Sequence, residues 1–236
     1  MSVLVATDVH AHYGKSHVLQ GASFALRDKA ITAILGRNGS GRSTLLKALM
    51  GIVPPSRGSV VMGNRDIVGL SPHHIARAGI GYVPEDRQVF SNLSVLENLR
   101  IGQQGRRDGA PYWTVDDMFE FFPRLKERRT QLAGTMSGGE QQMLTLCRSL
   151  MGNPSVLLVD EPTEGLAPQI VERLGDVLRD IASRGVTLLL VEQKLTMALA
   201  ISQHVLVMGH GHIVLDAPID EFKLRDDIRS EWLDLA

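Results

Sequence analysis

The residues best suited to chemistry begin with a glycine-rich segment, residues 36–44, which reads GRNGSGRST. It has the pattern of a phosphate-binding loop with one departure, since Arg42 stands where lysine is expected. The glycines let the backbone wrap around phosphate oxygens, so that N–H groups at a helix start point inward. The alternative is a turn that merely connects two elements. The predicted phosphate-contacting residues are Gly36, Arg37, Asn38, Gly39, Ser40, Gly41, Arg42, Ser43 and Thr44, with the Ser43 hydroxyl also placed for Mg²⁺.

Two adjacent acids follow an apolar run, in the sequence VLLVDE of residues 156–161. A buried strand that ends in carboxylates places charge at the carboxyl edge of a sheet, where ligands bind in open α/β folds. We predict that Asp160 holds Mg²⁺ and that Glu161 orients the attacking water. The alternative is a strand that simply ends in a polar loop.

A third motif, MSGGEQQ, covers residues 136–142. Ser137 and Glu140 have the spacing of a helix capping box, which is a sufficient structural explanation for that pair. A capping box does not require Gly138 and Gly139, however. Without side chains, these glycines expose the N–H groups of the helix start to an external anion.

Short apolar runs alternate with helix-period segments, which is typical of an α/β sheet. We predict a helix at 41–50, a half-exposed strand at 22–27, and a strand hairpin at 204–215 around Gly-His-Gly. Val171, Leu174, Leu178 and Ile181 mark one face of a further helix. The predicted buried strands are 30–35, 156–159 and 187–191.

The stretch 92–152 has little strand signal, more charge, and helix starts at Ser94 and Ser137. We therefore predict one domain, in which residues 1–91 and 153–236 form the α/β core with a β subdomain. Residues 92–152 form an inserted helical subdomain.

Composition limits the function classes. The chain has 236 residues with a net charge of -1, and that balance argues against nucleic acid as the main partner. Its single cysteine, Cys147, is expected in the core of a protein from a reducing compartment. The start shows no signal-peptide pattern, and the aliphatic runs are too short to span a membrane. Three histidine pairs lack zinc-site spacing and are expected at the surface: His10 and His12, His73 and His74, His210 and His212.

The three motifs in this order resemble the ABC ATPases, and the resemblance runs through the whole chain. The segments YVPE (82–85), FPRL (122–125), DEPTEGLAP (160–168) and VEQ (191–193) resemble one branch, the smaller ATPase subunit of branched-chain amino acid importers. The urea importer subunit is a near neighbour. The resemblance implies a P-loop NTPase fold of ABC type, with a mixed central sheet, an antiparallel β subdomain and a helical lobe.

The resemblance also implies roles by position. Tyr13 would stack on adenine, and the less favoured alternative is a half-buried tyrosine at a strand end. Glu85 would sense Mg²⁺ and the γ-phosphate, and Gln193 would hydrogen-bond the γ-phosphate in place of the usual histidine. Ala167 removes a carboxylate that the family usually has there. The signature residues Ser137, Gly138, Gly139 and Glu140 would act on the nucleotide of a second ATPase subunit.

The implied cofactors are ATP and Mg²⁺, and the implied partners are a second ATPase subunit and integral membrane permease subunits. The chain would then be cytoplasmic, at the inner face of the cell membrane through the permease and without inserting itself. Arg42 leads to the hypothesis that hydrolysis at this site is slow, because guanidinium is wider than an ammonium. Three alternatives remain: the ATPase subunit of an importer of urea or other amides, a catalytically silent subunit whose partner hydrolyses ATP, and a soluble ABC ATPase of repair or translation.

Overall fold

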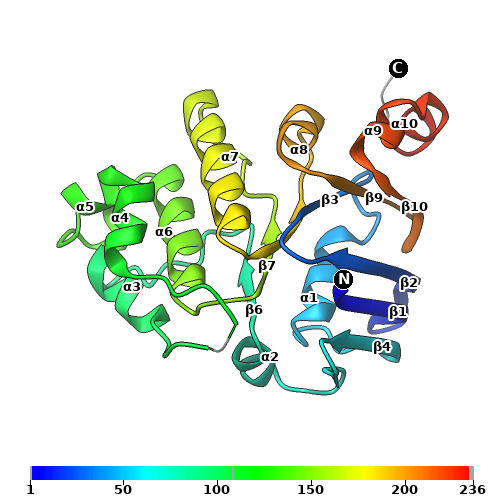
Figure 1. The fold of residues 1–236 in the computed structure, drawn as a ribbon, viewed down its shortest axis with the longest axis horizontal. Coiled ribbons are helices and arrows are strands. Elements are labelled where there is room, and N and C mark those ends of the chain that lie inside the picture. The colour runs from blue at the N-terminus through cyan, green and yellow to red at the C-terminus, as the bar shows by residue number, and fades with distance from the viewer. Residues whose placement is uncertain (1, 108, 234–236) are drawn as a thin grey trace.

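The computed structural model describes residues 2–107 and 109–233 and contains a central six-stranded sheet (Figure 1). Its strand order is β10-β9-β3-β8-β7-β6, in which β10 is antiparallel to β9 and the other pairs are parallel. The predicted strands are confirmed, and β3, β7, β8 and β9 are buried at every position, as expected for a sheet covered on both faces. The bounds are β3 Ile31–Leu35, β6 Ile80–Val83, β7 Val156–Asp160, β8 Thr187–Val191, β9 His204–Gly209 and β10 His212–Pro218.

Helices cover the two faces of this sheet. Leu45, Leu46 and Leu49 of α1 pack against one face, and Leu174 and Leu178 of α7 pack against the other. Successive strand residues serve the two cores in turn, because side chains alternate along a strand. The helices of this part are α1 Arg42–Leu49, α2 Pro72–Ala78, α7 Pro168–Ser183 and α8 Leu195–Ile201.

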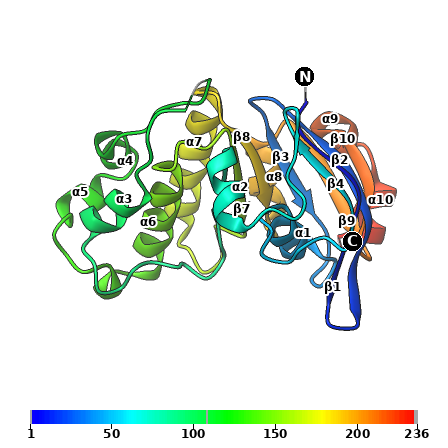
Figure 2. The same ribbon diagram turned by 90° about the horizontal axis from the view of Figure 1, so that it is seen from below.

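A second, antiparallel sheet with the order β2-β1-β4-β5 shares the α1 core. Figure 2 shows it as a curved layer beside the central sheet. It confirms the expected antiparallel β subdomain, but the sequence predicted only the second half of β2 and missed the other strands. The bounds are β1 Ser2–Tyr13, β2 Ser16–Arg27, β4 Arg57–Met62 and β5 Arg65–Asp66.

The helices between β6 and β7 gather at one end of the molecule, shown in green in Figure 1. The two helix starts predicted at Ser94 and Ser137 are confirmed, and each is a complete capping box. The predicted subdomain ranges also include residues 1, 108 and 234–236, which lie outside the described residues. The elements are α3 Val95–Gly102, α4 Val115–Phe121, α5 Pro123–Glu127, the 3-10 helix Ala133–Thr135 and α6 Gly138–Leu150.

The chain ends in two short helices, α9 Ile219–Lys223 and α10 Asp226–Trp232, which lie beside β9 and β10 (Figure 1). Across the described ranges, each helix falls short of the length and apolarity that crossing a bilayer would require.

Candidate functional site

The predicted phosphate loop, residues 36–44, begins directly after β3, and its last three residues form the first turn of α1. Gly39 and Gly41 have φ angles of 81° and 108°, a left-handed backbone that glycine adopts without steric cost. Gly36 allows β9 to approach, because a Cβ there would overlap the backbone oxygen of Met208. Gly41 is the N-cap of α1 and has no side chain to accept a hydrogen bond from the amides that follow. The geometry of the loop is therefore suited to an anion at the helix start.

Ser43 and Asp160 meet where α1 begins and β7 ends. The Ser43 hydroxyl donates to Oδ1 of Asp160 at 2.9 Å, and the Tyr82 hydroxyl donates to Oδ2 at 3.1 Å. Burial raises the pKa of Asp160, and the two hydrogen bonds oppose that rise. Sequence reasoning predicted Ser43 and Asp160 but missed Tyr82, whose pKa is raised by burial and by the adjacent carboxylate.

Arg42 lies under the loop with 5% of its surface exposed. Its Nη2 donates to Oε1 of Glu161 at 3.1 Å and to Oδ1 of Asn38 at 3.2 Å, and its Nη1 donates to the backbone oxygen of Glu192 at 3.3 Å. The ion pair is buried on both sides, with 9% of the Glu161 side chain exposed. The positive charge of the loop is thus directed at the carboxylate predicted to orient water.

Glu161 has an unusual backbone, with a φ of 43°. Residues other than glycine rarely adopt this left-handed conformation, and such strain concentrates at functional sites. The Glu161 amide donates to the oxygen of Val191 at 3.0 Å, which ties the turn to the end of β8. Gln193 donates its side-chain amide to Oε2, so Arg42 and Gln193 together hold both carboxylate oxygens. Burial raises the pKa of Glu161, and the Gln193 hydrogen bond and the Arg42 charge oppose that rise.

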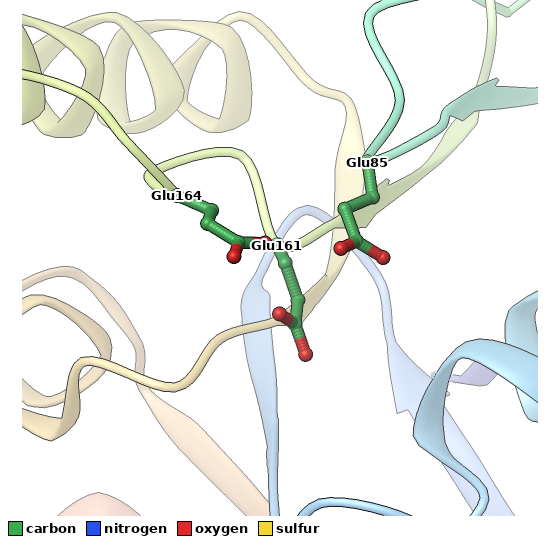
Figure 3. A group of neighbouring side chains, drawn as sticks. All are labelled: Glu85, Glu161 and Glu164. Atoms are coloured by element: carbon green, nitrogen blue, oxygen red, sulfur yellow. The ribbon is translucent and has the colours of Figure 1, made fainter.

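Glu85, from the loop after β6, forms a group with Glu161 and Glu164 (Figure 3). One oxygen from each carboxylate lies within 4.8 Å of the others. A hydrogen bond with Glu164, partial burial and the charge of Glu161 raise the pKa of Glu85. Three converging carboxylates repel one another, so this corner of the site attracts a cation or a shared proton. The sequence predicted Glu85 and Glu161 here but did not single out Glu164.

Magnesium prefers hard oxygen ligands, usually one or two carboxylates together with phosphates and water. Ser43 and Asp160 supply a hydroxyl and a carboxylate 2.9 Å apart beside the helix start, and this donor set fits Mg²⁺. Glu85, the third predicted ligand, is grouped with Glu161 and Glu164 instead, although Asp160 is close enough to raise its pKa.

The signature segment opens α6. The Ser137 hydroxyl accepts from the Glu140 amide at 3.4 Å, and the Glu140 carboxylate accepts from the Ser137 amide at 3.0 Å, so the capping box is present. Arg87 bridges this helix start to the segment after Glu161, because it donates to the Glu164 backbone oxygen at 3.1 Å and lies where a Cβ on Gly138 would be. Sequence reasoning missed Arg87, because no motif includes it. Its left-handed backbone, with a φ of 51°, could not be predicted from an arginine either.

Tyr13 ends β1 with 48% of its surface exposed, which leaves its ring accessible for stacking. Next to it, the rings of His12 and His17 stack 4.2 Å apart, and those of His10 and His17 lie 5.1 Å apart. His12 is at the surface as expected, but His10 is partly buried because it packs in this stack and contacts Asp8. His17, which the sequence analysis did not consider, is the centre of the stack.

Residues 19–164 match the family model described as ABC transporter. The high-affinity branched-chain amino acid transport ATP-binding protein BraG of Pseudomonas aeruginosa is 42% identical, over 88% of this chain and 89% of that protein. The probable branched-chain amino acid transport ATP-binding protein LivF of Archaeoglobus fulgidus is 34% identical, over 93% of each chain.

Among solved structures, a nucleotide-free ATP-binding cassette from an ABC transporter superposes with a TM-score of 0.86. The two sequences are 27% identical, and the superposition covers the full length of both chains. The agreement in fold therefore includes both sheets and the helical region.

Proposed function

The chain belongs to the ABC transporter family and is an ATPase, and from that premise we propose that it energises an importer of branched-chain amino acids. Two observations support the solute class: BraG and LivF are both described as branched-chain amino acid transport ATP-binding proteins, and both are similar to this chain over most of its length. The resemblance to the importer branch supports import as the direction of transport. Within the part of the chain that the structure describes, no helix can span a bilayer, so permease subunits would carry the solute.

One observation supports the chemical role most directly: the side chains of the phosphate loop meet the two acids. Arg42 contacts Glu161, and Ser43 contacts Asp160, although 119 and 117 residues separate the partners in the chain. In the proposed reaction Glu161 orients a water that attacks the γ-phosphorus and accepts the proton that this water loses. The bond from that phosphorus to the β,γ-bridging oxygen breaks, and ADP and phosphate leave. Gln193 positions Glu161, and Arg42 stabilises charge on the phosphates.

Ser43 and Asp160 would hold Mg²⁺, which neutralises charge on the β- and γ-phosphates when it is bound. The charges of Glu161 and Asp160 both act on Glu85 and raise its pKa. Glu85 would therefore respond to the charge of a γ-phosphate bound beside these acids. Tyr13 would stack on the adenine ring, and the amides of residues 39–44 would enclose the phosphates.

A complete site would require a second ATPase subunit. The uncapped loop of this chain binds the triphosphate, and the α6 start of the opposing subunit would cover the γ-phosphate. Contacts to the γ-phosphate disappear on hydrolysis, so the nucleotide would shift the equilibrium between closed and open dimers. The helical subdomain 92–152, inserted between residues 1–91 and 153–236, would transmit this change to the permease near residues 90–99, where Phe90 is 49% exposed.

The test is ATPase activity of the reconstituted transporter against a panel of solutes. Leucine, isoleucine and valine should stimulate ATP hydrolysis and accumulate inside the vesicles. Stimulation by urea or short amides alone would transfer the proposal to the urea importer subunit. Hydrolysis without any solute uptake, or export of the solute, would refute the importer role.

A second candidate is a subunit that binds ATP but hydrolyses it slowly. The buried Arg42–Glu161 ion pair favours it, because a carboxylate paired with a guanidinium is a weaker base toward water. ATP affinity measured beside turnover, with and without a second ATPase subunit, distinguishes the two. Tight ATP binding by this chain, together with turnover of the assembled pair that Glu161→Gln leaves unchanged, supports the slow subunit, because its own site then contributes little hydrolysis.

A further inference from the structure

The turn between β9 and β10 is joined to the phosphate loop by the backbone. The Gly211 amide donates to the backbone oxygen of Ser40 at 3.0 Å, and the Gly211 oxygen accepts from the Gln20 amide at 3.0 Å. His210 and Gly211 have φ angles of 46° and 81°, two consecutive left-handed residues that close a tight hairpin. This turn therefore fixes the position of the phosphate loop relative to the β subdomain.

Met208, which precedes this turn at the end of β9, also lies against the phosphate loop. A Cβ on Gly36 would overlap the backbone oxygen of Met208, and a Cβ on Gly41 would lie 3.0 Å from the Met208 methyl group. The end of β9 and the phosphate loop thus share a surface with no room for an added carbon atom, and a shift of one displaces the other.

The last described helix, α10, covers the other side of the turn. A Cβ on Gly209 would overlap the indole of Trp232, and the His210 ring meets that indole edge-on at 5.6 Å between centroids. Figure 1 shows α10 beside the β9–β10 hairpin, far along the chain from the loop that the hairpin contacts. A cavity of about 250 Å³ separates Glu231 and Trp232 from the loop residues 37–40.

We propose that Trp232 is a positioning residue for ATP binding, which acts on the phosphate loop through the β9–β10 turn. The indole holds Gly209 and His210, the Gly211 amide holds the Ser40 oxygen, and the loop amides keep the spacing that the phosphates require. Preorganised amides bind an anion more tightly than amides that must first be ordered. The effect therefore falls mainly on affinity, because the turn contacts the loop at Ser40, whereas the water-orienting group Glu161 is reached only through Arg42.

The inference depends on the phosphate loop being the ATP site, which is part of the proposed function. The Trp232→Ala protein, as the full chain, is expected to bind MgATP about three- to tenfold more weakly by calorimetry. KM in the assembled transporter should rise by the same factor with little change in kcat. Trp232→Phe should restore most of the affinity, because it keeps a ring against Gly209. Leu224→Ala is the matched control, since that side chain is 83% exposed in the same terminal segment.

If Trp232→Ala does not fold, the fluorescence of Trp232 in a folded protein tests the same inference. The chain has two tryptophans, and Trp113 is buried in the helical region, so Trp113→Phe leaves Trp232 as the only indole. MgATP should change the emission of that protein and leave the emission of Trp232→Phe unchanged. Unaltered emission from Trp232, or an unchanged affinity in a folded Trp232→Ala protein, overturns the inference. Absence of ATP binding by the wild-type chain would instead refute the proposed function.

Discussion

The guanidinium of Arg42 lies 3.1 Å from the carboxylate of Glu161, in a buried ion pair between the phosphate loop and the end of β7. A lysine ammonium at position 42 would be a point charge on a thin stem, whereas guanidinium is planar and forms several directed hydrogen bonds. Here those bonds go to Glu161, Asn38 and the Glu192 backbone. The phosphates of ATP must therefore compete with these three protein groups for hydrogen bonds from the Arg42 guanidinium.

We expect Arg42→Lys to raise ATP turnover. The substitution keeps the charge and removes the directed bond to Glu161, a charge-assisted hydrogen bond that contributes about 1.5–3 kcal/mol, or roughly ten- to a hundredfold in rate. Steady-state ATPase assays of the assembled transporter measure the effect. Arg57→Lys, at a residue whose side chain is 74% exposed on β4, is the matched control. Equal or lower turnover in Arg42→Lys would show that the ion pair does not limit hydrolysis.

Glu161→Gln should abolish most turnover and preserve ATP binding. The amide has nearly the same shape but cannot accept a proton, and loss of a general base costs about 10²–10⁴ in rate. The variant should also unfold at a lower temperature, because Arg42 loses its buried counter-charge. Glu164→Gln, in the same loop, should retain measurable activity. Turnover by Glu161→Gln above a tenth of the wild-type rate would exclude Glu161 as the base.

Ser43→Ala tests the proposed magnesium ligands. Removal of the hydroxyl leaves Asp160 with the Tyr82 hydrogen bond alone, and we expect the Mg²⁺ concentration for half-maximal activity to rise about tenfold. Excess chelator should stop hydrolysis by the wild-type protein. Titration of ATPase activity with Mg²⁺ measures this change. Ser40→Ala removes a different hydroxyl of the same loop and serves as the comparison. An identical Mg²⁺ requirement in Ser43→Ala and wild type would assign the ion to other residues.

The parts of the site that could be predicted are those whose residues follow a pattern within one short segment. A glycine-rich loop follows one apolar run, and two acids follow a second apolar run. Each arrangement predicts the carboxyl edge of a parallel sheet. The contact between Arg42 and Glu161 has no such pattern, because it joins positions 119 residues apart through tertiary packing. Arg87 was missed for the same reason, since its contacts with Glu164 and Gly138 join residues that lie far apart along the chain.

The fold shows the same division. Buried strands such as β8 were predicted because every residue is apolar or β-branched. The strand β1 was missed, although it is 12 residues long, because its run contains Asp8 and two histidines. The pairing of β1 with both β2 and β4, and not its composition, stabilises it.

Tyr13→Ala should weaken ATP binding. Base–aromatic stacking contributes about 1–3 kcal/mol in nucleic-acid complexes, so the Kd is expected to rise roughly five- to a hundredfold. Tyr13→Phe keeps the ring and should bind almost as tightly as wild type. Tyr112→Ala, which removes a ring 40% exposed in the helical region, is the control for general loss of an aromatic side chain. Equal affinities of the two alanine variants would rule out stacking at position 13.

The histidine stack should make stability sensitive to mild acid. Loss of hydration, then the charges of His12 and His10, lowers the pKa of His17 below 6.5, and His212 adds to the effect while a hydrogen bond with the Leu19 backbone opposes it. Asp8 is the acid that contacts the stack, and it is shared between His10 and Arg57.

Because the folded pKa of His17 is depressed, the unfolded chain binds more protons, and stability falls as pH drops below about 6.5 toward the folded value. The midpoint of thermal unfolding should therefore decrease between pH 7 and pH 5.5 more in wild type than in His17→Gln. His73→Gln, on α2 and outside the stack, should behave like wild type. If His17→Gln shows the wild-type pH dependence, the acid sensitivity arises elsewhere, and the stack is a neutral packing contact.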